Sequence, residues 1–330
     1  MPRLLHFIAL LWNLTQSFSF ISRGKDGNQR HISPLRSSVT PSLAKSRYTT
    51  KEPLQCVIRS VKQVGSNGFD REFYHIVIDS MGKYAYTDGE YCGIIPPGIS
   101  EKTNRRHTPR SYSLAPLLDG DGDDTSCFSI CVRTTICKDD SPHSSSMKGI
   151  CSTFLSRSEP GTPVSVTGPF GKNLTLSPDD LHNNLIFVAT GTGISPFRGF
   201  LRTLEKKSKN KDPNSLGRIL LFFGVQNYST YIYRSELEKY VDLFNGRFMI
   251  IPCFSRHSVA SERGYVQDNI LKSKDLIASM AETSKDKKCS IFICGRKGME
   301  VPVREALSTA FGNLPNRDSL LNNIKIEVYQ

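Results

Sequence analysis

One glycine turn has the residue types and spacing to bind an anion. Residues 186–189 form a short apolar run typical of a strand, Gly191 and Gly193 follow it, and Pro196 can occupy the first turn of a helix. Glycines let backbone N–H groups approach a phosphate closely, and a helix N-terminus adds partial positive charge. The turn therefore predicts an anion site, with an ordinary strand-to-helix loop as the alternative.

Residue identity excludes three more specific motifs at this turn. The dinucleotide fingerprint G-x-G-x-x-G lacks its third glycine, because Phe197 stands near that position. A phosphate-binding P-loop needs Gly-Lys-Ser/Thr, and none follows. Ser195 is not the nucleophile of a G-x-S-x-G elbow, since that motif needs glycine where Phe197 stands.

Length and charge restrict the class of protein. The 330 residues suffice for two domains with separate cores, and the formal net charge is +12. Residues 1–50 hold seven basic residues and one acidic residue, which leaves 36 basic and 30 acidic residues, or +6, in residues 51–330. A moderately basic body suits phosphates or an acidic partner and does not require nucleic acid.

The cysteines and histidines argue against a metal site. Nine cysteines are scattered singly, and the seven histidines are isolated from one another. Without paired C-x-x-C units, neither zinc nor iron–sulfur ligation is expected, and no metal is predicted. We interpret the cysteines as reduced thiols that mostly serve packing.

Residues 1–50 have the composition of a two-part targeting leader. Arg3 precedes an apolar stretch at residues 4–12 that is too short to span a bilayer and resembles a secretory signal. The rest of the leader is rich in Ser, Thr, Arg and Lys and nearly free of acid, like a transit peptide. We expect a removed, disordered leader of the kind that directs proteins to a plastid of secondary origin. The alternative is a simple secreted protein, against which the odd, scattered cysteines argue.

Residues 51–178 read as an antiparallel β-domain. Short alternating or β-branched runs, separated by turn residues, predict a barrel or a sandwich, and they cover residues 55–58, 73–78, 91–95, 110–114, 128–133 and 163–166. The loop at residues 119–124 imitates a calcium loop, but Asp124 stands at the glycine position and Ile130 at the final glutamate position. Calcium is therefore rejected in favour of a hairpin loop.

Residues 179–330 read as a doubly wound α/β-domain. Continuous apolar runs alternate with helix-length spacers, and they cover residues 186–189, 219–224, 248–253, 290–295 and 324–328. A capping box at residues 235–238 predicts one helix start. Three of the runs end at Gly191, Gly224 and Gly295, so one long ligand is expected along the carboxyl edge of a parallel sheet.

Taken together, residues 51–329 resemble plastid-type ferredoxin–NADP reductase, of the apicoplast-like kind that carries a two-part leader. The resemblance is carried by Arg110-Ser-Tyr-Ser, Gly149-Ile-Cys-Ser-Thr-Phe-Leu, Gly168-Pro-Phe-Gly-Lys, Gly191-Thr-Gly-Ile-Ser-Pro-Phe-Arg, Phe254-Ser-Arg, Tyr265-Val-Gln, Cys294-Gly-Arg-Lys-Gly-Met-Glu and Glu327-Val-Tyr. It implies an FAD-binding β-barrel over 51–178 and an NADP-binding α/β-domain over 179–330.

The resemblance implies a flavin site on the barrel. Arg110 would bind the FAD pyrophosphate, Tyr112 would pack on one face of the isoalloxazine, and Ser113 would lie near flavin N5. The family's second pyrophosphate contact matches the helix start at Gly149, Cys151 and Ser152; read without the resemblance, this is a plain N-cap. Cys131 also matches a cofactor-binding position.

The resemblance further implies an NADP site on the sheet. Thr192 and Gly193 would bind the NADP pyrophosphate, and Gly295 and Met299 would border the nucleotide. The pocket for the 2′-phosphate and adenine matches Ser255, Arg256, Arg263, Tyr265 and Gln267. Two arginines on a phosphate dianion would separate NADP from NAD, with a solvated basic loop as the alternative.

Hydride transfer would take place between the two sites. Ser113, Cys294 and Glu327 match the residues that shape it. Tyr329 matches the terminal tyrosine that covers the other flavin face and moves aside for nicotinamide. Without the resemblance, Cys294 reads as a core thiol and Glu327 as a solvated strand residue.

The chain departs from the family pattern at three positions. Gln330 follows the tyrosine at which the family usually ends, so access of nicotinamide is expected to differ. Cys137 stands where the family stacks an aromatic on the FAD adenine. Arg133 replaces a lysine near the NADP phosphates, which keeps the charge and changes the geometry.

The activity implied by the resemblance is reversible electron transfer. NADPH would pass a hydride to flavin N5, and the flavin would give single electrons to two ferredoxin molecules in turn. In a non-photosynthetic plastid, the net flow would run from NADPH to ferredoxin. Basic candidates to receive acidic ferredoxin, a [2Fe-2S] protein, are Lys62, Arg71, Lys83, Arg105 and Arg106.

Two alternatives remain open on the sequence. One is a related FAD/NADPH reductase with a haem or small-molecule acceptor, which would share every FAD and NADP feature. The other is a basic binding module without enzymatic activity, for nucleic acid or a membrane surface. That module would leave the glycine-ended strands unexplained, so neither nucleic acid binding nor stable membrane insertion is expected.

Overall fold

The computed structural model describes residues 47–117, 125–138, 145–208, 216–282 and 288–329. Most of the expected leader, the loop at 119–124 and Gln330 lie outside these ranges, as does the side chain of Cys137. The last residues of the expected leader are described: Tyr48 pairs with Gly168 through two backbone hydrogen bonds of 2.8 and 2.9 Å. The helices within the described ranges lack the length and apolarity needed to cross a bilayer.

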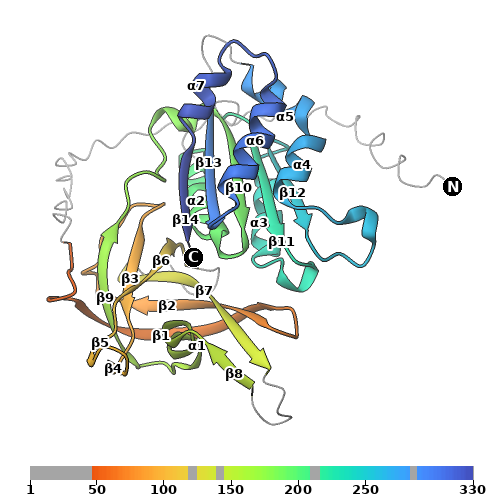
Figure 1. Cartoon of the computed structure of the whole chain (residues 1–330). Coiled ribbons are helices and arrows are strands. Elements are labelled where there is room, and N and C mark those ends of the chain that lie inside the picture. The colour runs from red at the N-terminus through yellow and green to blue at the C-terminus, as the bar shows by residue number, and fades with distance from the viewer. Residues whose placement is uncertain (1–46, 118–124, 139–144, 209–215, 283–287, 330) are drawn as a thin grey trace, which may run out of the picture. The chain divides into compact units, whose positions relative to one another are not determined.

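The first half forms a closed antiparallel barrel, as the sequence predicted. Its strands are β1 (Leu54–Ser66), β2 (Arg71–Asp79), β3 (Tyr91–Ile95), β6 (Arg110–Ala115), β7 (Cys127–Lys138), β8 (Ser145–Lys148) and β9 (Pro163–Phe170). They follow the order β2-β1-β9-β3-β6-β7-β8, and an additional pairing of β2 with β7 closes six of them into a ring (Figure 1). A small hairpin, β4 (Ile99–Ser100) and β5 (Arg105–Arg106), stands apart from this sheet.

Side chains of alternating strand positions fill the barrel. Ile58, Ile76 and Phe128 are fully buried in this core, with no exposed surface. Helix α1 (Ile150–Arg157) buries Cys151 and Leu155 in the same core. The barrel thus presents the start of α1 beside strand β6, which carries Arg110 and Tyr112.

The second half forms a parallel sheet of five strands. They are β10 (Asn184–Thr190), β11 (Ile219–Val225), β12 (Phe248–Phe254), β13 (Cys289–Arg296) and β14 (Lys325–Tyr329). Their order is β12-β11-β10-β13-β14, and every pairing is parallel. The order reverses between β10 and β13, which is where open α/β sheets bind their ligands.

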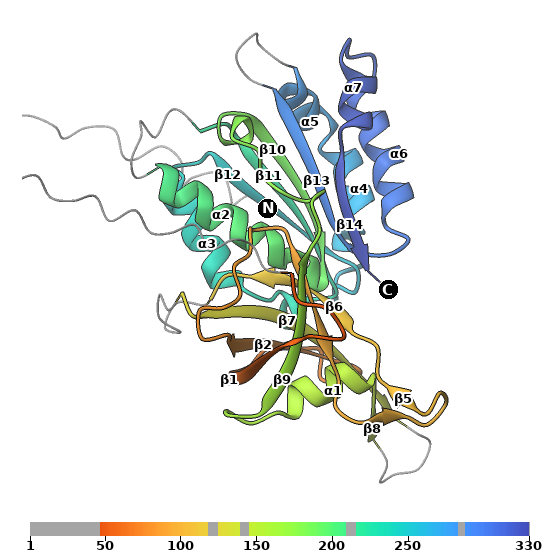
Figure 2. The same ribbon diagram turned by 90° about the vertical axis from the view of Figure 1, so that its left-hand side faces the viewer.

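Helices cover both faces of this sheet (Figure 2), so the strands are apolar on both sides. One face packs against α2 (Ser195–Ser208) and α3 (Arg234–Leu243). The other packs against α4 (Val266–Lys272), α5 (Lys274–Ala281), α6 (Glu300–Phe311) and α7 (Arg317–Asn322). Neighbouring residues of β10 alternate between the two cores: Phe187 faces α2, whereas Ile186 and Val188 face the other helices.

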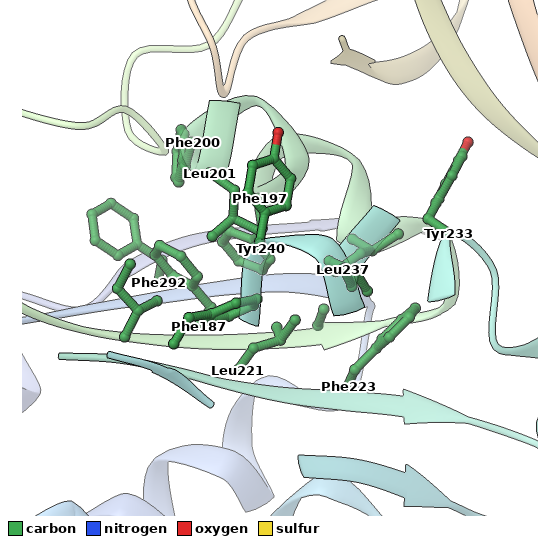
Figure 3. Close-up of a cluster of buried hydrophobic side chains, with 14 of the residues drawn as sticks. Phe187, Phe197, Phe200, Leu201, Leu221, Phe223, Tyr233, Leu237, Tyr240 and Phe292 are labelled. Carbon is green, nitrogen blue, oxygen red and sulfur yellow. The ribbon is translucent and has the colours of Figure 1, made fainter. Parts of the chain in front are cut away.

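Aromatic side chains dominate the core beneath α2 (Figure 3). Phe187 stacks on Phe197 with ring centroids 4.7 Å apart, and Phe292 meets Phe200 edge to face at 5.4 Å. The opposite side of α2 approaches the barrel. A Cβ added to Gly199 would lie 2.6 Å from a carboxylate oxygen of Asp88, and Thr203 donates a hydrogen bond of 2.6 Å to that carboxylate. Helix α2 therefore contacts both halves of the protein.

The predicted capping box at residues 235–238 is wrong. Helix α3 begins one residue earlier, at Arg234, and Tyr233 precedes it in the left-handed conformation with φ of 58° and no side-chain cap. Tyr233 is buried by its packing against the barrel and α2, and this tertiary anchor fixes the helix start in place of Ser235.

Candidate functional site

A pocket of about 400 Å³ lies where the carboxyl edge of the sheet meets the barrel. Its sheet side is formed by the ends of strands, including Thr190, Gly224 and Cys253, and its barrel side by Arg71, Phe73 and Arg133. A pocket of this size at the reversal of strand order can hold part of a nucleotide.

Several of the residues expected to bind NADP line this pocket: Arg133, Ser255, Tyr265, Gln267 and Met299. Thr192, Gly193 and Gly295 do not line it. Tyr329, which was expected to cover the flavin and move aside for nicotinamide, lines the pocket as well. Gly191 also lines it. Ser255 follows β12, and its backbone N–H donates to the carbonyl of Val225 at 2.9 Å. Met299 stands before α6, where its sulfur accepts a hydrogen bond of 3.2 Å from the Thr190 hydroxyl. Gly295, in β13, adjoins the same Met299 sulfur.

The glycine turn is a short 3-10 helix, Gly191–Ile194, that leads directly into α2. A Cβ added to Gly193 would lie 2.3 Å from the carbonyl oxygen of Cys294, so only glycine allows the turn to press against β13. Thr192 donates a hydrogen bond of 2.8 Å to the hydroxyl of Tyr329, which itself donates to the carbonyl of Thr190 at 3.0 Å. The final strand is thereby tethered to the turn.

The pocket is strongly cationic, since the described residues that line it include Arg71, Arg133, Arg296 and Lys297 and none is acidic. Burial is the main cause that lowers the pKa of Arg71, with the Asp70 charge opposing. The positive charges of Arg133, Arg256 and Arg296 lower the pKa of Arg71 further. A bound phosphate would relieve this repulsion between cations. The residues that line the pocket therefore fit the phosphate groups of a nucleotide such as NADP.

The lining residues that were not assigned to this site from the sequence include Arg71, Gln226, Arg296 and Lys297. Arg71 was a candidate for receiving ferredoxin, and the structure places it in the nucleotide pocket. Arg296 and Lys297 end β13, so the general position of ligands at strand ends could have found them. Arg71 could not be found that way, because its place depends on how the barrel meets the sheet.

The two arginines expected at the 2′-phosphate lie beside the pocket and do not line it. The Arg263 guanidinium donates a hydrogen bond of 2.6 Å to the carbonyl of His257 in its own loop. The charge of Arg256 acts on both Asp70 and Arg71. Tyr265, 62 % exposed, precedes α4, and its backbone N–H donates to Asp268 at 2.8 Å. Arg256 directly follows Ser255 in the chain, and Arg263 lies two residues before Tyr265. Because Ser255 and Tyr265 line the pocket, both arginines are close to the part of the pocket that these two residues form.

Ser113, Cys294 and Glu327 come together next to the turn. Cys294 and Glu327 are partners in the pairing of β13 with β14, and Ser113 of the barrel hydrogen-bonds with the Cys294 thiol. Burial, then the nearby Glu327 charge, raises the pKa of Cys294. Burial also raises the pKa of Glu327 to about 7. The cluster thus pairs a neutral thiol with a carboxyl group that can hold or release a proton near neutral pH.

The residues expected at the flavin gather where β6 meets α1. The Arg110 guanidinium donates to the hydroxyl of Thr108 at 2.7 Å, and Tyr112 hydrogen-bonds with the Cys151 thiol. Burial raises the pKa of Cys151 to about 11, while Tyr112 and the Arg110 charge oppose it. Gly149 precedes α1, and its carbonyl accepts a hydrogen bond of 3.1 Å from Ser152.

This arrangement fits an FAD. The first turn of α1 holds no acidic residue, and the buried hydroxyl of Thr153 has no hydrogen-bond partner among the described residues. A helix N-terminus with a spare hydroxyl and a nearby arginine suits a pyrophosphate. Cys131 is buried in β7, two positions before Arg133, so it lies on the same side of that strand behind the pocket.

Comparison with known proteins agrees with this geometry. A family model described as an oxidoreductase NAD-binding domain matches residues 187–305. The root-type chloroplastic ferredoxin–NADP reductase of Nicotiana tabacum is 35 % identical over 282 residues, which cover 84 % of this chain and 73 % of the relative. The chloroplastic ferredoxin–NADP reductase of Chlamydomonas reinhardtii is 35 % identical over 268 residues, covering 79 % and 73 %.

A solved structure gives the same result. The ferredoxin–NADP⁺ reductase of Plasmodium falciparum superposes with a TM-score of 0.68 at 28 % identity, covering 86 % of this chain and 98 % of that one. A closed β-barrel joined to a nucleotide-binding parallel sheet defines this chain as a two-domain oxidoreductase. The chain belongs to the ferredoxin–NADP reductase family.

The raised pKa of Glu327 predicts how stability depends on pH. The folded protein holds this proton up to about pH 7, whereas the unfolded chain loses it near the ordinary value of 4.5. The Glu327 contribution to stability is therefore fully present below the unfolded pKa and is lost as pH rises through the folded pKa. Glu327→Gln should leave the free energy of unfolding little changed near pH 4.5 and raise it relative to the parent above pH 7. Denaturant titrations across this range measure the difference, and a pH-independent difference would contradict the buried carboxyl.

Proposed function

We propose that this protein transfers electrons between NADPH and ferredoxin through a bound FAD. The observation that carries the proposal is that a cationic pocket lies beside the Ser113–Cys294–Glu327 cluster: Arg296 and Tyr329, which line the pocket, pair two positions after Cys294 and Glu327. The names of the relatives specify NADP and ferredoxin, and the +6 charge of residues 51–330 suits an acidic protein partner.

The division of labour proposed here gives FAD to residues 51–178 and NADP to residues 179–330. When bound, the flavin couples the two-electron chemistry of a nicotinamide to the one-electron chemistry of an iron–sulfur protein. On the barrel, Arg110 and the start of α1, with Gly149, Cys151 and Ser152, bind its pyrophosphate. Tyr112 supplies a flat apolar face for the ring system.

The sheet residues bind and orient the nucleotide. The N–H groups of the turn, at Thr192 and Gly193, would bind the pyrophosphate, and the charges of Arg133 and Arg296, which line the pocket, would neutralise it. Ser255, Arg256, Arg263, Tyr265 and Gln267 receive the 2′-phosphate and adenine. Gly295 and Met299 border the nicotinamide end, and Cys131 supports the wall that carries Arg133.

Three side chains prepare the place of hydride transfer. Ser113 and Cys294 fix each other by their hydrogen bond, and Glu327 holds a proton beside them. Tyr329 lines the pocket with its hydroxyl bound to the turn, so it occupies space that the nicotinamide requires. Release of these two hydrogen bonds lets the nicotinamide enter.

The visible spectrum of the purified protein tests the cofactor, nucleotide and partner together. We expect a flavin spectrum that bleaches much faster with NADPH than with NADH, and reduction of an acidic [2Fe-2S] ferredoxin that weakens as salt is added. A flavin that bleaches but does not reduce ferredoxin would move the function to a haem or small-molecule acceptor. A colourless protein that binds no added FAD would reject the proposal.

A paired substitution tests the 2′-phosphate assignment. Arg256→Ala with Arg263→Ala should raise the KM for NADPH by roughly tenfold or more and leave the slower reaction with NADH nearly unchanged, because NADH lacks the phosphate that these charges meet. The matched control is Arg234→Ala, which removes an exposed arginine of the same domain. An equal rise of KM for NADPH and NADH would contradict the assignment of Arg256 and Arg263 to the 2′-phosphate.

The cellular site and the direction of flow form one further proposal. We infer a plastid, and specifically a non-photosynthetic one of the apicoplast type, from the two-part composition of residues 1–50; relatives named as chloroplastic support the plastid. Electrons would then run from NADPH to ferredoxin. A fluorescent protein fused behind residues 1–50 should enter the plastid of a host cell that has one. Secretion of the reporter, or purification of the enzyme with photosystem I, would contradict the proposal.

A further inference from the structure

One arginine is completely buried one turn after the start of α2. Arg198 has 0 % of its side chain exposed. Its Nε donates to a carboxylate oxygen of Glu236 in α3 at 2.9 Å, and its Nη2 lies 2.8 Å from the same oxygen. The guanidinium carbon also lies 3.9 Å from the centre of the Tyr233 ring. The charge is thus held on one side by an anion and on another by an aromatic face.

Tyr233 extends this contact into the barrel. Its hydroxyl lies 3.0 Å from Nδ1 of His75 in β2 and hydrogen-bonds with the thiol of Cys131 in β7. Figure 3 shows the ring at one end of the aromatic cluster, with its hydroxyl directed away from the sheet. Burial lowers the pKa of His75 to about 3, and the charge of Arg198 adds to this effect, so the imidazole stays neutral beside the arginine.

The residues that Tyr233 contacts lie next to residues that line the nucleotide pocket, on the same two strands of the barrel. His75 and Cys131 are partners in the pairing of β2 with β7. Two residues earlier in β2 and two later in β7, Phe73 pairs with Arg133, and both of these line the pocket. Because strand side chains repeat every two residues, these two pairs stand on one side of the barrel wall.

A buried ion pair is a costly way to obtain stability. Desolvation of both charges offsets most of their attraction, and well-packed apolar residues of similar volume often serve equally well. Such a pair does fix the relative orientation of the two side chains, because a planar guanidinium donates hydrogen bonds in only a few directions. Arg198 therefore has the properties of a device that fixes the placement of the segments that surround it.

We propose that Arg198 is a positioning residue for hydride transfer. Through Glu236 and Tyr233 it holds the glycine turn and α2 at a fixed place relative to the β2–β7 wall of the barrel, and so sets the distance between the two cofactors. Arg198 does not line the nucleotide pocket. The role in hydride transfer rests on the proposed function, whereas the fixing of the turn does not.

Two variants and one control separate this role from general stability. Arg198→Met leaves the carboxylate of Glu236 buried without its partner and can fail to fold. The double variant Arg198→Met with Glu236→Leu removes both charges, so it retains an apolar contact and is the main test. The control is Arg234→Met, which removes an ion pair on the same helix whose partners are 52 % and 53 % exposed.

Hydrogen exchange of the FAD-loaded protein without nucleotide gives the first readout. In the double variant, amides of residues 190–200 and 128–135 should exchange at least roughly tenfold faster, while those of the remaining sheet keep the parent rates. The control should match the parent throughout. Parent-like exchange in both segments of the double variant would overturn the proposal, whether or not the protein reacts with NADPH.

Nucleotide measurements give the second readout. The rate of flavin bleaching at saturating NADPH should fall roughly tenfold or more in the double variant, because misplacement lowers the rate of the reacting step. The affinity for 2′-phospho-AMP, whose assigned contacts at Ser255, Arg256, Arg263, Tyr265 and Gln267 all lie in the sheet domain, should change by less than about twofold. If the bleaching rate and the affinity for 2′-phospho-AMP fall by equal factors, Arg198 has only a structural role and the proposal is wrong. A parent that is not bleached by NADPH would reject the proposed function and leave hydrogen exchange to decide the fixing of the turn.

Discussion

The contact between Gly193 and the carbonyl of Cys294 is the constraint on which the site depends. It presses the glycine turn, Gly191–Ile194, against β13 with no room for a side chain. Cys294 is in turn fixed on two sides, by its strand partner Glu327 and by the hydrogen bond from Ser113 of the barrel. One backbone contact thus aligns the turn, the final strand and the barrel. A shift at any of the three would change the spacing of the others.

The two parts of the site differ sharply in charge. The pocket gathers arginines, and burial together with the repulsion from Arg133, Arg256 and Arg296 lowers the pKa of Arg71, which suits a site for an anion. Next to it, burial raises the pKa of Cys294 and of Glu327, so that cluster tends to be neutral. In the proposed function, phosphates would be attracted to the pocket, while the neighbouring cluster would offer a low-charge environment suited to a nicotinamide ring. This difference in charge would help to orient a dinucleotide.

Elements with strong local signals were predictable from the sequence. The apolar runs predicted all five parallel strands, and the glycines at their ends indicated the edge of the sheet at which the pocket lies. The pairing of Cys294 with Glu327 was not predictable from the residues themselves, because it depends on the register between strands 33 positions apart in the chain. The resemblance to a family supplied it instead.

The remaining differences arise from packing between the two halves. In the sequence, Arg71 is one basic residue among many. It lines the pocket only because the barrel and the sheet are in contact there. Ser235 had the pattern of a helix cap, but the buried Tyr233 fixed the start of α3 instead. Arg198 has the side chain of a solvated helix position, and its burial requires both Glu236 and Tyr233 to be in place. Local propensity cannot report contacts that a third segment completes.

Tyr329 shows why the two halves of the nucleotide should contribute differently to binding. Its hydroxyl is held by Thr190 and Thr192, so in the proposed mechanism the nicotinamide displaces a side chain that is already bonded to the turn. The adenosine end meets no such obstacle, because Tyr265 is exposed and Ser255 already lines the pocket. Part of the favourable energy from the phosphates and adenine is then used to open the nicotinamide position. Binding strength would reside mainly at one end of the ligand and reactivity at the other, with the turn from Gly191 to Ile194 connecting the two.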